Sequence, residues 1–342
     1  MADSYLVVGG GGFLGGHIVE LLLARGEAAV AVFDLVPAKF DPDRVKIFVG
    51  DMTDEKALSD AVKACGATCI MHTAAVLPGK PRAVQELVNV QGTVNVINAA
   101  HANGVTKLVF TSSASVVYGG KDQAGVDETE KYPAVPFDDY NDTKAIAESK
   151  VLAANGTDGL CTCSLRPAGI FGPKDVKGPV PAMMNMAAKG NSHVQLGSST
   201  NLYDWTYVTN IADAHLLAAD RLAPTHPKHA LVAGQAFFIS NGDPRPWWDF
   251  PRMLWRAGGF VETRRRVVIP RPVALVIAFL AEVVGWITGK EPTLTRFRIH
   301  YICTERWCNI SKAREALDYE PRVSLEEGAR ISAEWWKSQQ ST

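Results

Sequence analysis

Short apolar runs alternate with helical patterns along the first half of the chain. An apolar run without polar interruptions is typical of a strand buried on both faces, and apolar residues spaced three and four apart indicate one buried helix face. The runs predict strands at 5–9, 28–34, 45–51, 68–75, 107–114 and 160–167. The helical patterns predict helices at 13–26, 54–65, 83–104 and 138–155. Strands separated by helices favour an α/β fold with a doubly wound parallel sheet of the Rossmann type.

The pattern changes after Pro167, and residues 171–200 are rich in Gly, Pro, Met and Asn. The sequence then predicts a strand at 202–208, a helix at 210–222 and a strand at 235–240. We expect a nucleotide-binding Rossmann domain over 1–170, completed by parts of 200–240. Residues 171–342 are expected to form mainly a smaller, interleaved C-terminal lobe that binds substrate.

A glycine-rich turn joins the first predicted strand to the first helix. Three of its six glycines, Gly9, Gly12 and Gly15, have the spacing GxxGxxG. The backbone turns sharply at the first, a pyrophosphate approaches it at the second, and the third lets the helix pack closely on the sheet. The helix N-terminus then offers N–H groups and a partial positive charge to phosphates. The motif predicts a dinucleotide site, and nothing in the sequence gives the other three glycines a role.

Acidic residues follow the second and third strands. Asp34 lies 19 residues after the last glycine of the motif, where a carboxylate accepts hydrogen bonds from the ribose of NAD and repels the 2′-phosphate of NADP. The alternative for Asp34 is an ordinary turn residue. Asp51 is placed to reach the adenine amino group, with Met52 against the ring. The alternative for Asp51 is a helix cap, which Thr53 or Asp54 would provide equally well.

Tyr140 and Lys144 lie four residues apart in one predicted helix and so share a face. An ammonium group there stabilises tyrosinate and lowers the pKa of the phenol, which then transfers protons near neutral pH. This spacing is common, but the hydroxyl cluster at 111–113 ends the fifth strand, at the edge of the sheet where ligands bind in this fold. We choose Ser113 as the hydroxyl that holds a substrate oxygen, with Ser115 as the alternative.

Together these motifs resemble the extended short-chain dehydrogenase/reductase family over nearly the whole chain. The matching segments are GxxGxxG at 9–15, Asp34, GDMTD at 50–54, HTAA at 72–75, TSSASVVYG at 111–119, Tyr140, Lys144, LRPAGIFGP at 165–173, DWTYVTNIADAH at 204–215 and LDYEPRVSLEEG at 317–328. More narrowly, stretches such as SSASVVYGG, CSLRPAGIFGPKD and SNGDPRPWWDF resemble the 3β-hydroxysteroid dehydrogenases, and among them the sterol-4α-carboxylate 3-dehydrogenase (decarboxylating) group.

The resemblance implies an NAD-dependent dehydrogenase that oxidises the 3β-hydroxyl of a sterol or steroid, with Ser113, Tyr140 and Lys144 as catalytic residues. If the substrate is a 4-carboxysterol, the product is a β-keto acid and loses CO₂. The alternative is a nucleotide-sugar epimerase or dehydratase of the same family. A dinucleotide-sensing regulator is disfavoured, because such proteins usually lose the tyrosine and lysine. The implied cofactor contacts are Gly9, Gly12, Phe13, Leu14, Gly15, Asp34, Asp51, Met52, Ala74, Ala75, Tyr140, Lys144 and Pro167.

The substrate end of the site is less defined. A substrate carboxylate could be held by Lys80, by Arg82 or by an arginine of the second lobe, and the sequence does not choose among them. Four tryptophans fit an apolar pocket for a flat substrate, and core packing is an equally good explanation for each. They are Trp205, Trp247, Trp248 and Trp255.

Composition narrows the class of partner. With 47% hydrophobic and 21% charged residues, the 342-residue chain can bury a large core. A formal net charge of −1 leaves no basic surface for nucleic acid, so we expect a small apolar substrate and no nucleic acid, with a homodimer as one assembly to test. The six cysteines match no metal motif. We expect no metal, no disulfides and a reducing, cytoplasmic location.

The apolar segment 273–287 raises a further question. It has 15 residues, including Glu282, whereas a membrane span needs roughly 20. A buried or substrate-lining helix is the favoured interpretation. However, arginines at 264–266 and 271 precede the segment, and basic residues beside an apolar helix favour an anionic membrane surface. Peripheral contact with the endoplasmic reticulum membrane through 264–287 is therefore the alternative.

Overall fold

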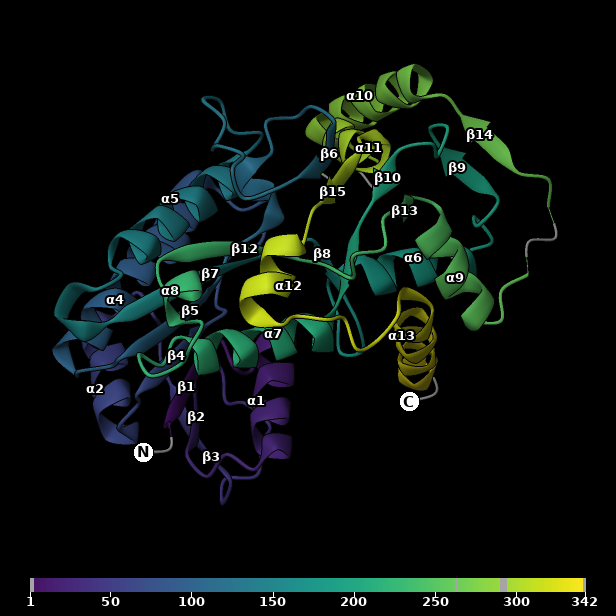
Figure 1. Ribbon diagram of the computed structural model, residues 1–342. Coiled ribbons are helices and arrows are strands. Elements are labelled where there is room, and N and C mark those ends of the chain that lie inside the picture. Colours follow the sequence, from purple (N-terminus) through teal and green to yellow (C-terminus); the bar gives the residue numbers. More distant parts are fainter. Residues whose placement is uncertain (1–2, 262–263, 290–293, 341–342) are drawn as a thin grey trace.

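The computed structural model describes residues 3–261, 264–289 and 294–340 of the chain. Within these residues, seven parallel strands form a central sheet in the order β12-β7-β5-β4-β1-β2-β3 (Figure 1). The strand order runs outward in both directions from β1 and β4, as in a doubly wound fold. The predicted α/β fold is therefore confirmed. The strands are β1 (Tyr5–Val8), β2 (Val30–Asp34), β3 (Val45–Val49), β4 (Cys69–His72), β5 (Lys107–Thr111), β7 (Cys161–Pro167) and β12 (Gln235–Ile239).

Helices cover both faces of the central sheet (Figure 1). α1 (Phe13–Arg25) and α7 (Val208–Arg221) pack against each other on one face. α2 (Glu55–Cys65), α4 (Gly92–Ala102) and α5 (Asp139–Ala153) cover the other. The predicted helices in these regions are confirmed, and their ends are displaced by only a few residues.

Strand β1 shows why the strands were predictable. Tyr5 and Val7 belong to the core beneath α1 and α7, whereas Leu6 and Val8 belong to the core beneath α2, α4 and α5. All four side chains are at most 2% exposed. Because successive strand residues point to opposite faces and both faces are covered, every position is apolar.

The long helix predicted at 83–104 is divided into three parts. α3 (Arg82–Gln85) leads into a π-helical segment, η1 (Glu86–Gln91), which continues as α4. The irregular segment turns the side chain of Asn89 toward the loop after β4, where its Oδ1 accepts a hydrogen bond from the Val76 N–H at 2.8 Å. An interruption of this kind fixes a loop that borders the candidate site.

The smaller lobe is built from short elements of distant parts of the chain. A four-stranded sheet has the order β13-β10-β15-β6, and two pairs of strands, β11 with β8 and β14 with β9, accompany it. β6 of this sheet comes from the first half of the chain. Conversely, β12 of the central sheet and α12 (Ser311–Leu317), which packs on β12, come from the second half, so the two lobes interleave. The strands are β6 (Gln123–Val126), β8 (Gly169–Phe171), β9 (Val194–Leu196), β10 (Leu202–Tyr203), β11 (Trp205–Tyr207), β13 (Arg245–Pro246), β14 (Val267–Ile269) and β15 (Arg306–Cys308).

Further helices complete the structure. α6, α9 and α13 enclose an aromatic core in the smaller lobe, and α10 lies on its outer edge against α11 (Figure 1). The helices are α6 (Pro179–Ala188), α8 (His229–Val232), α9 (Asp249–Ala257), α10 (Arg271–Thr288), α11 (Arg296–Cys303), α12 (Ser311–Leu317), α13 (Leu325–Gln340) and the 3₁₀ turns η2 (Ala114–Val117) and η3 (Thr157–Gly159).

The prediction of one continuous strand at 202–208 was wrong, because the structure divides this segment into two strands that belong to different sheets. β10 and β11 are separated by Asp204, whose carboxylate is fully buried and accepts a hydrogen bond from the Ser240 hydroxyl at 2.6 Å. The buried carboxylate with its hydroxyl partner marks the point where the chain passes from one sheet to the other.

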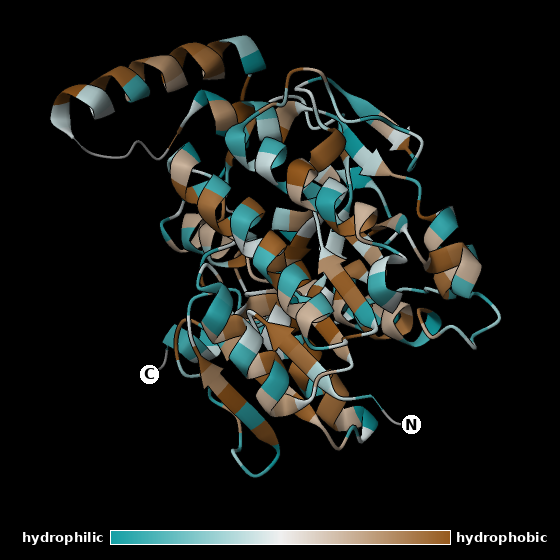
Figure 2. Cartoon of the chain, turned by 90° about the vertical axis from the view of Figure 1, so that its left-hand side faces the viewer, coloured by the Kyte–Doolittle hydropathy of each residue, from teal (hydrophilic) through white to brown (hydrophobic). Residues whose placement is uncertain are grey.

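Helix α10 contradicts the favoured interpretation of the apolar segment. It projects from the body of the smaller lobe with an apolar surface (Figure 2), and it contributes no side chain to the wall of the main cavity. Within α10, all of which is described, Ala274 and Ala278 are the buried residues. An all-round apolar pattern does not distinguish a helix covered by protein from one exposed at the surface. The exposed large side chains are Val273, Val276, Ile277, Phe279, Leu280, Val283, Val284, Trp286 and Ile287.

Candidate active site

A cavity of 1440 Å³ opens at the carboxyl ends of the central strands, between the sheet and the smaller lobe. A pocket for one drug-sized ligand measures roughly 300–1,000 Å³, so this cavity has room for a long cofactor and a substrate together. Of the predicted site residues, Gly15 lies behind the wall. The others line the cavity: Gly9, Gly12, Phe13, Leu14, Asp34, Asp51, Met52, Ala74, Ala75, Ser113, Tyr140, Lys144 and Pro167.

The glycine turn forms a cradle at one end of the cavity. Gly9 has a φ of +84°, and a Cβ there would lie 2.7 Å from the Ala74 nitrogen. A Cβ on Gly15 would overlap the Gly9 carbonyl oxygen and lie 2.8 Å from the Gly10 Cα. Gly12 is the N-cap residue that precedes α1, where a Cβ would lie 3.1 Å from the Gly9 carbonyl oxygen. The first-turn N–H groups of a helix have no partners within the helix, so this surface fits a phosphate group.

Two further glycines have structural roles that the spacing alone did not reveal. A Cβ on Gly10 would lie 2.7 Å from Cγ2 of Val32, so the turn can rest directly on β2. The Gly11 N–H donates a hydrogen bond to Asp34 Oδ2 at 2.9 Å. That bond holds the Asp34 carboxylate at the cavity wall with its second oxygen available to a ligand.

Asp51 and Met52 lie beyond Asp34 at the same end of the cavity. The alternative role of Asp51 as a cap of α2 is wrong, because the Asp54 side chain accepts the hydrogen bond from the Ala57 N–H at the start of that helix. Asp51 Oδ1 instead accepts a hydrogen bond from Thr53 N–H at 2.8 Å. Met52 is 5% exposed and forms part of the wall.

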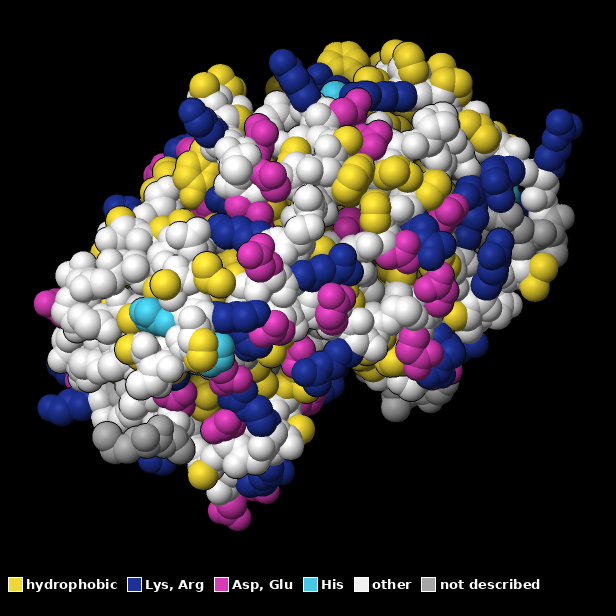
Figure 3. All heavy atoms as spheres, in the orientation of Figure 1, with side chains coloured by type: hydrophobic (Ala, Val, Ile, Leu, Met, Phe, Trp, Pro, Cys, Tyr) yellow, Lys and Arg dark blue, Asp and Glu magenta, His cyan; other side chains and the backbone are white. Residues whose placement is uncertain are grey.

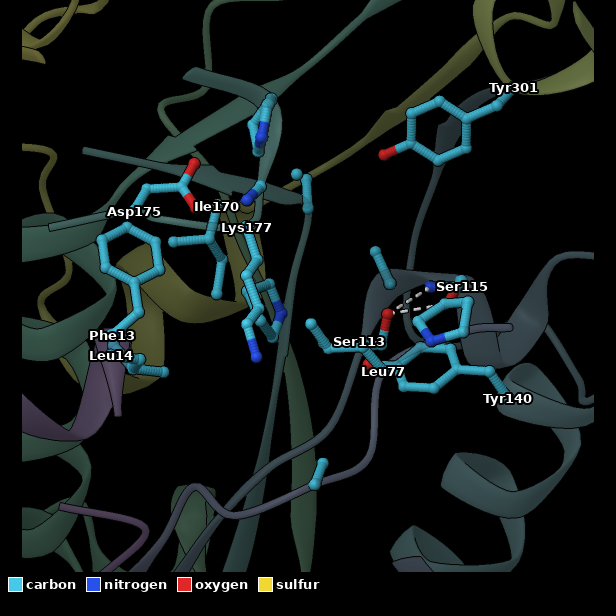
Figure 4. A pocket seen from close by; sticks show the side chains of 18 of the residues that line it. Phe13, Leu14, Leu77, Ser113, Ser115, Tyr140, Ile170, Asp175, Lys177 and Tyr301 are labelled. Carbon is cyan, nitrogen blue, oxygen red and sulfur yellow. Dashed lines mark hydrogen bonds between the residues drawn. The ribbon is translucent and has the colours of Figure 1, made fainter. Parts of the chain in front are cut away.

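The hydroxyl cluster and the tyrosine meet at the middle of the cavity (Figure 4). Ser113 and Ser115 share a hydrogen bond of 2.7 Å between their hydroxyl oxygens, and the Ser115 N–H also points to Ser113 Oγ at 3.2 Å. The ring of Tyr140 lies beside Ser113 in the same view. Both candidate serines are thus near the tyrosine, and Ser113 is the one whose hydroxyl interacts with it.

Lys144 extends from α5 to the end of β5. Its Nζ donates a hydrogen bond of 2.6 Å to the Thr111 carbonyl and lies 4.1 Å from the centroid of the Phe110 ring. The side chain is 2% exposed, and burial lowers the pKa of Lys144 to about 7, although the Glu148 carboxylate acts in the opposite direction. An ammonium group has three N–H donors, so Lys144 retains donors for a ligand in the cavity.

The expected direction of the Tyr140 pKa was wrong. Burial raises the pKa of Tyr140 to about 12, and the nearby Asp138 and Tyr301 add to this, whereas the Ser113 hydroxyl lowers it. Lys144 is drawn toward the carbonyl of Thr111 and does not offset the loss of hydration. The phenol is therefore protonated at neutral pH.

Two supporting residues, Glu148 and His215, were missed from the sequence. Glu148, one helical turn beyond Lys144, is fully buried and forms an ion pair of 2.6 Å with Arg166 of β7. Thr111 donates its hydroxyl proton to His215 Nε2 at 2.7 Å, because the other ring nitrogen of His215 donates to the Ile211 carbonyl. The positions of Glu148 at i+4 from Lys144 and of Thr111 in the hydroxyl cluster were the available signals.

The far end of the cavity is aromatic. The four tryptophans singled out in the sequence are at most 6% exposed, pack in the core of the smaller lobe and also line the cavity. Core packing is therefore confirmed for all four, and their place in the cavity wall leaves the pocket for a flat substrate as a prediction. This surface suits a flat apolar molecule.

Comparison with known proteins agrees with this geometry. The model of the 3-beta hydroxysteroid dehydrogenase/isomerase family matches residues 6–271. The chain is 42% identical to the sterol-4-alpha-carboxylate 3-dehydrogenase, decarboxylating, of Candida albicans, over 97% of each chain. It is 35% identical to the protein of the same name from Homo sapiens, over 95% of this chain and 86% of the human one.

A solved structure of UDP-glucose 4-epimerase from Thermus thermophilus in complex with NAD has the same fold. The TM-score is 0.71, with 24% sequence identity over 98% of this chain and 99% of that chain. At this identity the likeness concerns the fold alone.

Proposed function

The chain belongs to the 3-beta hydroxysteroid dehydrogenase/isomerase family, and from this we propose that it oxidises the 3β-hydroxyl of a 4α-carboxysterol with NAD⁺ and that decarboxylation follows. The observation that carries the proposal is the placement of Ser113, Tyr140 and Lys144 between a dinucleotide cradle and an aromatic cavity. The names of relatives that are 35–42% identical over nearly the whole chain support the same substrate class.

The catalytic roles follow from the polar groups at the middle of the cavity. Ser113 Oγ and Tyr140 Oη hold the oxygen of the 3β-hydroxyl, and Tyr140 as tyrosinate takes its proton. Lys144, held against the Thr111 carbonyl, offers its remaining N–H donors to the cofactor ribose. NAD⁺, when bound along the glycine turn, supplies the hydride acceptor.

Decarboxylation requires no further catalytic group. Oxidation at C3 makes the 4-carboxylate a β-keto acid, in which the C4–carboxylate bond breaks and CO₂ leaves. The electron pair moves to the C3 oxygen, and the resulting enolate accepts hydrogen bonds from Ser113 and from Tyr140, which now carries the substrate proton. Protonation of C4 then gives the ketone.

A panel of substrates tests the proposal and its alternative. The protein is incubated with NAD⁺ and, separately, a 4α-carboxysterol, a 4α-methyl-3β-hydroxysterol, UDP-glucose and UDP-galactose. We expect NADH formation with the sterols and, from the carboxysterol, a ketone that has lost CO₂, identified by mass spectrometry. Turnover of nucleotide sugars alone would replace the proposal with an epimerase or dehydratase activity.

Asp34 is expected to determine the cofactor preference. Replacing Asp34 by Ser removes the carboxylate that the Gly11 N–H holds at the wall, and with it the repulsion of a 2′-phosphate. Placing two like charges against each other costs several kcal/mol, and the variant no longer imposes this cost on NADP⁺. The ratio of kcat/KM for NAD⁺ to kcat/KM for NADP⁺ should therefore fall about 10-fold or more. Steady-state kinetics with both cofactors measure this ratio. A wild-type preference for NADP⁺ would contradict the assigned role.

We further propose that the protein is a cytoplasmic enzyme that rests on the endoplasmic reticulum membrane through α10. The apolar side chains of α10 form the upper edge of the molecule, with Lys and Arg side chains beside them (Figure 3). Arg264 and Arg265 are exposed on the segment that leads to β14. This combination of an apolar helix and neighbouring basic residues suits an anionic membrane surface.

The neighbours of α10 connect this surface to the cavity. α10 packs on α11, and the α11 residues Phe297 and Tyr301 line the cavity. A membrane beneath α10 would therefore lie next to the cavity, so that an apolar substrate need not cross much water.

Replacing Leu280 and Trp286 together by Asp is expected to release the protein from vesicles. These side chains are 57% and 87% exposed, and burying one apolar side chain of this size contributes about 1.5–3 kcal/mol. The partition coefficient on phosphatidylcholine–phosphatidylserine vesicles, measured by flotation, should fall about 100-fold or more. Leu231→Asp, on α8 with a half-exposed side chain, is the matched control. A wild-type protein that does not float with these vesicles would contradict the proposal.

A further inference from the structure

Arg306 of β15 places a positive charge in the wall of the cavity. Its guanidinium carbon lies 4.1 Å from the ring centroid of Tyr118, 4.9 Å from that of Tyr301 and 6.0 Å from that of Tyr203. All four residues line the cavity. Stacking on aromatic rings fixes a guanidinium in position while its N–H edge remains available to a ligand.

The charge of Arg306 is not balanced by a carboxylate in contact with it. Within the described part of the chain, the structure records no ion pair for its side chain, and the interaction with Asp138 acts at longer range. By contrast, Arg82 pairs with Glu86, Asp139 and Asp142 on the surface and does not line the cavity. Lys80 was the other candidate from the loop after the fourth strand, and it does not line the cavity either.

The tyrosines around Arg306 add hydroxyl donors. The Tyr118 side chain is 1% exposed, and its buried hydroxyl has no hydrogen-bond partner among the described residues. The hydroxyls of Tyr203 and Tyr301 bond to each other, and in such a pair one O–H is left over to donate elsewhere. A guanidinium with two O–H donors is a complete set of partners for one carboxylate, which only accepts hydrogen bonds.

This group of donors is adjacent to the catalytic tyrosine. Tyr301 acts on the charge of Tyr140, as expected for two hydroxyls in one part of the cavity. Figure 4 shows the Tyr301 hydroxyl pointing into the cavity on the side of Ser113, Ser115 and Tyr140. In a 4α-carboxysterol the carboxylate is on the carbon next to C3, so it must lie close to the oxygen that Tyr140 holds.

We propose that Arg306, with the hydroxyls of Tyr118 and Tyr301, binds the 4α-carboxylate of the substrate. The inference rests on the proposed function and specifies how the enzyme selects a carboxylated sterol. Arg306 attracts the charge that is lost when CO₂ leaves, so it assists substrate binding and does not assist the breaking of the C4–carboxylate bond. It is thus a specificity-determining residue, and its loss should affect KM more than kcat.

The test compares two substrates that differ at one group, a 4α-carboxysterol and the corresponding 4α-methyl-3β-hydroxysterol. Removing a hydrogen-bonded charge partner costs about 10- to 100-fold in affinity. Arg306→Gln should therefore raise KM for the carboxysterol about 10- to 100-fold, with a much smaller change for the methyl sterol. Arg306→Lys, which keeps the charge, should recover part of the loss.

Tyr118→Phe removes one hydroxyl and leaves the ring against Arg306, so it keeps the proposal testable if Arg306→Gln unfolds. It should raise KM for the carboxysterol about 3- to 10-fold, in keeping with a single hydrogen bond. Lys177→Ala is the matched control, because Lys177 is an exposed cation on the same cavity (Figure 4). Thermal unfolding of each variant separates loss of structure from loss of contact.

The outcomes are distinct. If the wild-type enzyme oxidises neither sterol, the proposed function is wrong. If it oxidises both but Arg306→Gln and Tyr118→Phe change the two substrates equally, the inference is overturned while the function stands. A selective loss in Lys177→Ala with none in the Arg306 and Tyr118 variants would also overturn it.

Discussion

Tyr140→Phe is expected to lower kcat for NADH formation about 10³-fold while the protein remains folded and still binds NAD. Transfer of a proton by a positioned side chain contributes about 10²- to 10⁴-fold to the rate. The substitution removes one oxygen atom from a side chain on the cavity wall and leaves the ring in place. Ser113→Ala should have a smaller effect, because Tyr140 would still take the proton.

The pH dependence provides a second readout for Tyr140. Burial raises the pKa of Tyr140 to about 12, so the phenol is protonated near neutral pH, whereas oxidation of an alcohol requires the deprotonated form. In the wild type, kcat/KM for alcohol oxidation should therefore rise with pH through the neutral and alkaline range. The residual activity of Tyr140→Phe should lack this dependence. Full activity of that variant would exclude the mechanism.

The central sheet and the cofactor half of the site could be predicted because local patterns encode them. β1 is covered on both faces and so is apolar throughout, and β4 is apolar up to its last residue, the buried His72. Gly12 and Gly15 make their close contacts with Gly9 and Gly10, which the GxxGxxG spacing records, whereas the contact of Gly9 with Ala74 depends on the fold. Tyr140 and Lys144 are one helical turn apart, so their shared face is visible in the sequence.

The substrate half of the site was not predictable in the same way. Arg306 lies on β15, which has three residues and is joined to β6 and β10 from far away in the chain. Strands of two to four residues are too short to show a period. Tyr118 follows the 3₁₀ turn η2 and Tyr301 lies on α11, so the packing of these separate elements, and no repeating pattern, brings them to Arg306.

Exposure explains the error at α10. An apolar sequence fits a helix that is buried in the protein and equally a helix whose apolar side chains are exposed. The two cases differ only in what surrounds the helix. In the structure its small residues Ala274 and Ala278 form the narrow contact with the rest of the lobe, and the large side chains point outward. A pattern of hydropathy does not contain that information.

Gly15→Ala is expected to have the largest effect on stability among the variants described, and Gly16→Ala provides a matched control one residue away. A Cβ on Gly15 would overlap the Gly9 carbonyl oxygen, and the neighbouring atoms are backbone, which cannot turn aside as a side chain does. A Cβ on Gly16 would meet its nearest neighbour, the Gly10 carbonyl oxygen, at 3.8 Å, an ordinary contact. Both glycines are in α1, so helix propensity alone would favour alanine equally at the two positions.

The free energy of unfolding should therefore fall by about 3 kcal/mol in Gly15→Ala, as for an overpacked core, and rise by about 0.5–1 kcal/mol in Gly16→Ala. Displacing the Gly9 carbonyl also moves the turn that faces the cofactor, so the Kd for NAD should rise about 100-fold in Gly15→Ala. Urea unfolding and calorimetric titration measure the two quantities. Gly12→Ala separates the two quantities, because its Cβ would meet the Gly9 carbonyl oxygen at 3.1 Å and not overlap it, so this variant should lose less stability than Gly15→Ala while still weakening NAD binding at the cavity wall. Equal stability of the Gly15 and Gly16 variants would show that α1 does not pack on the turn as closely as the structure has it.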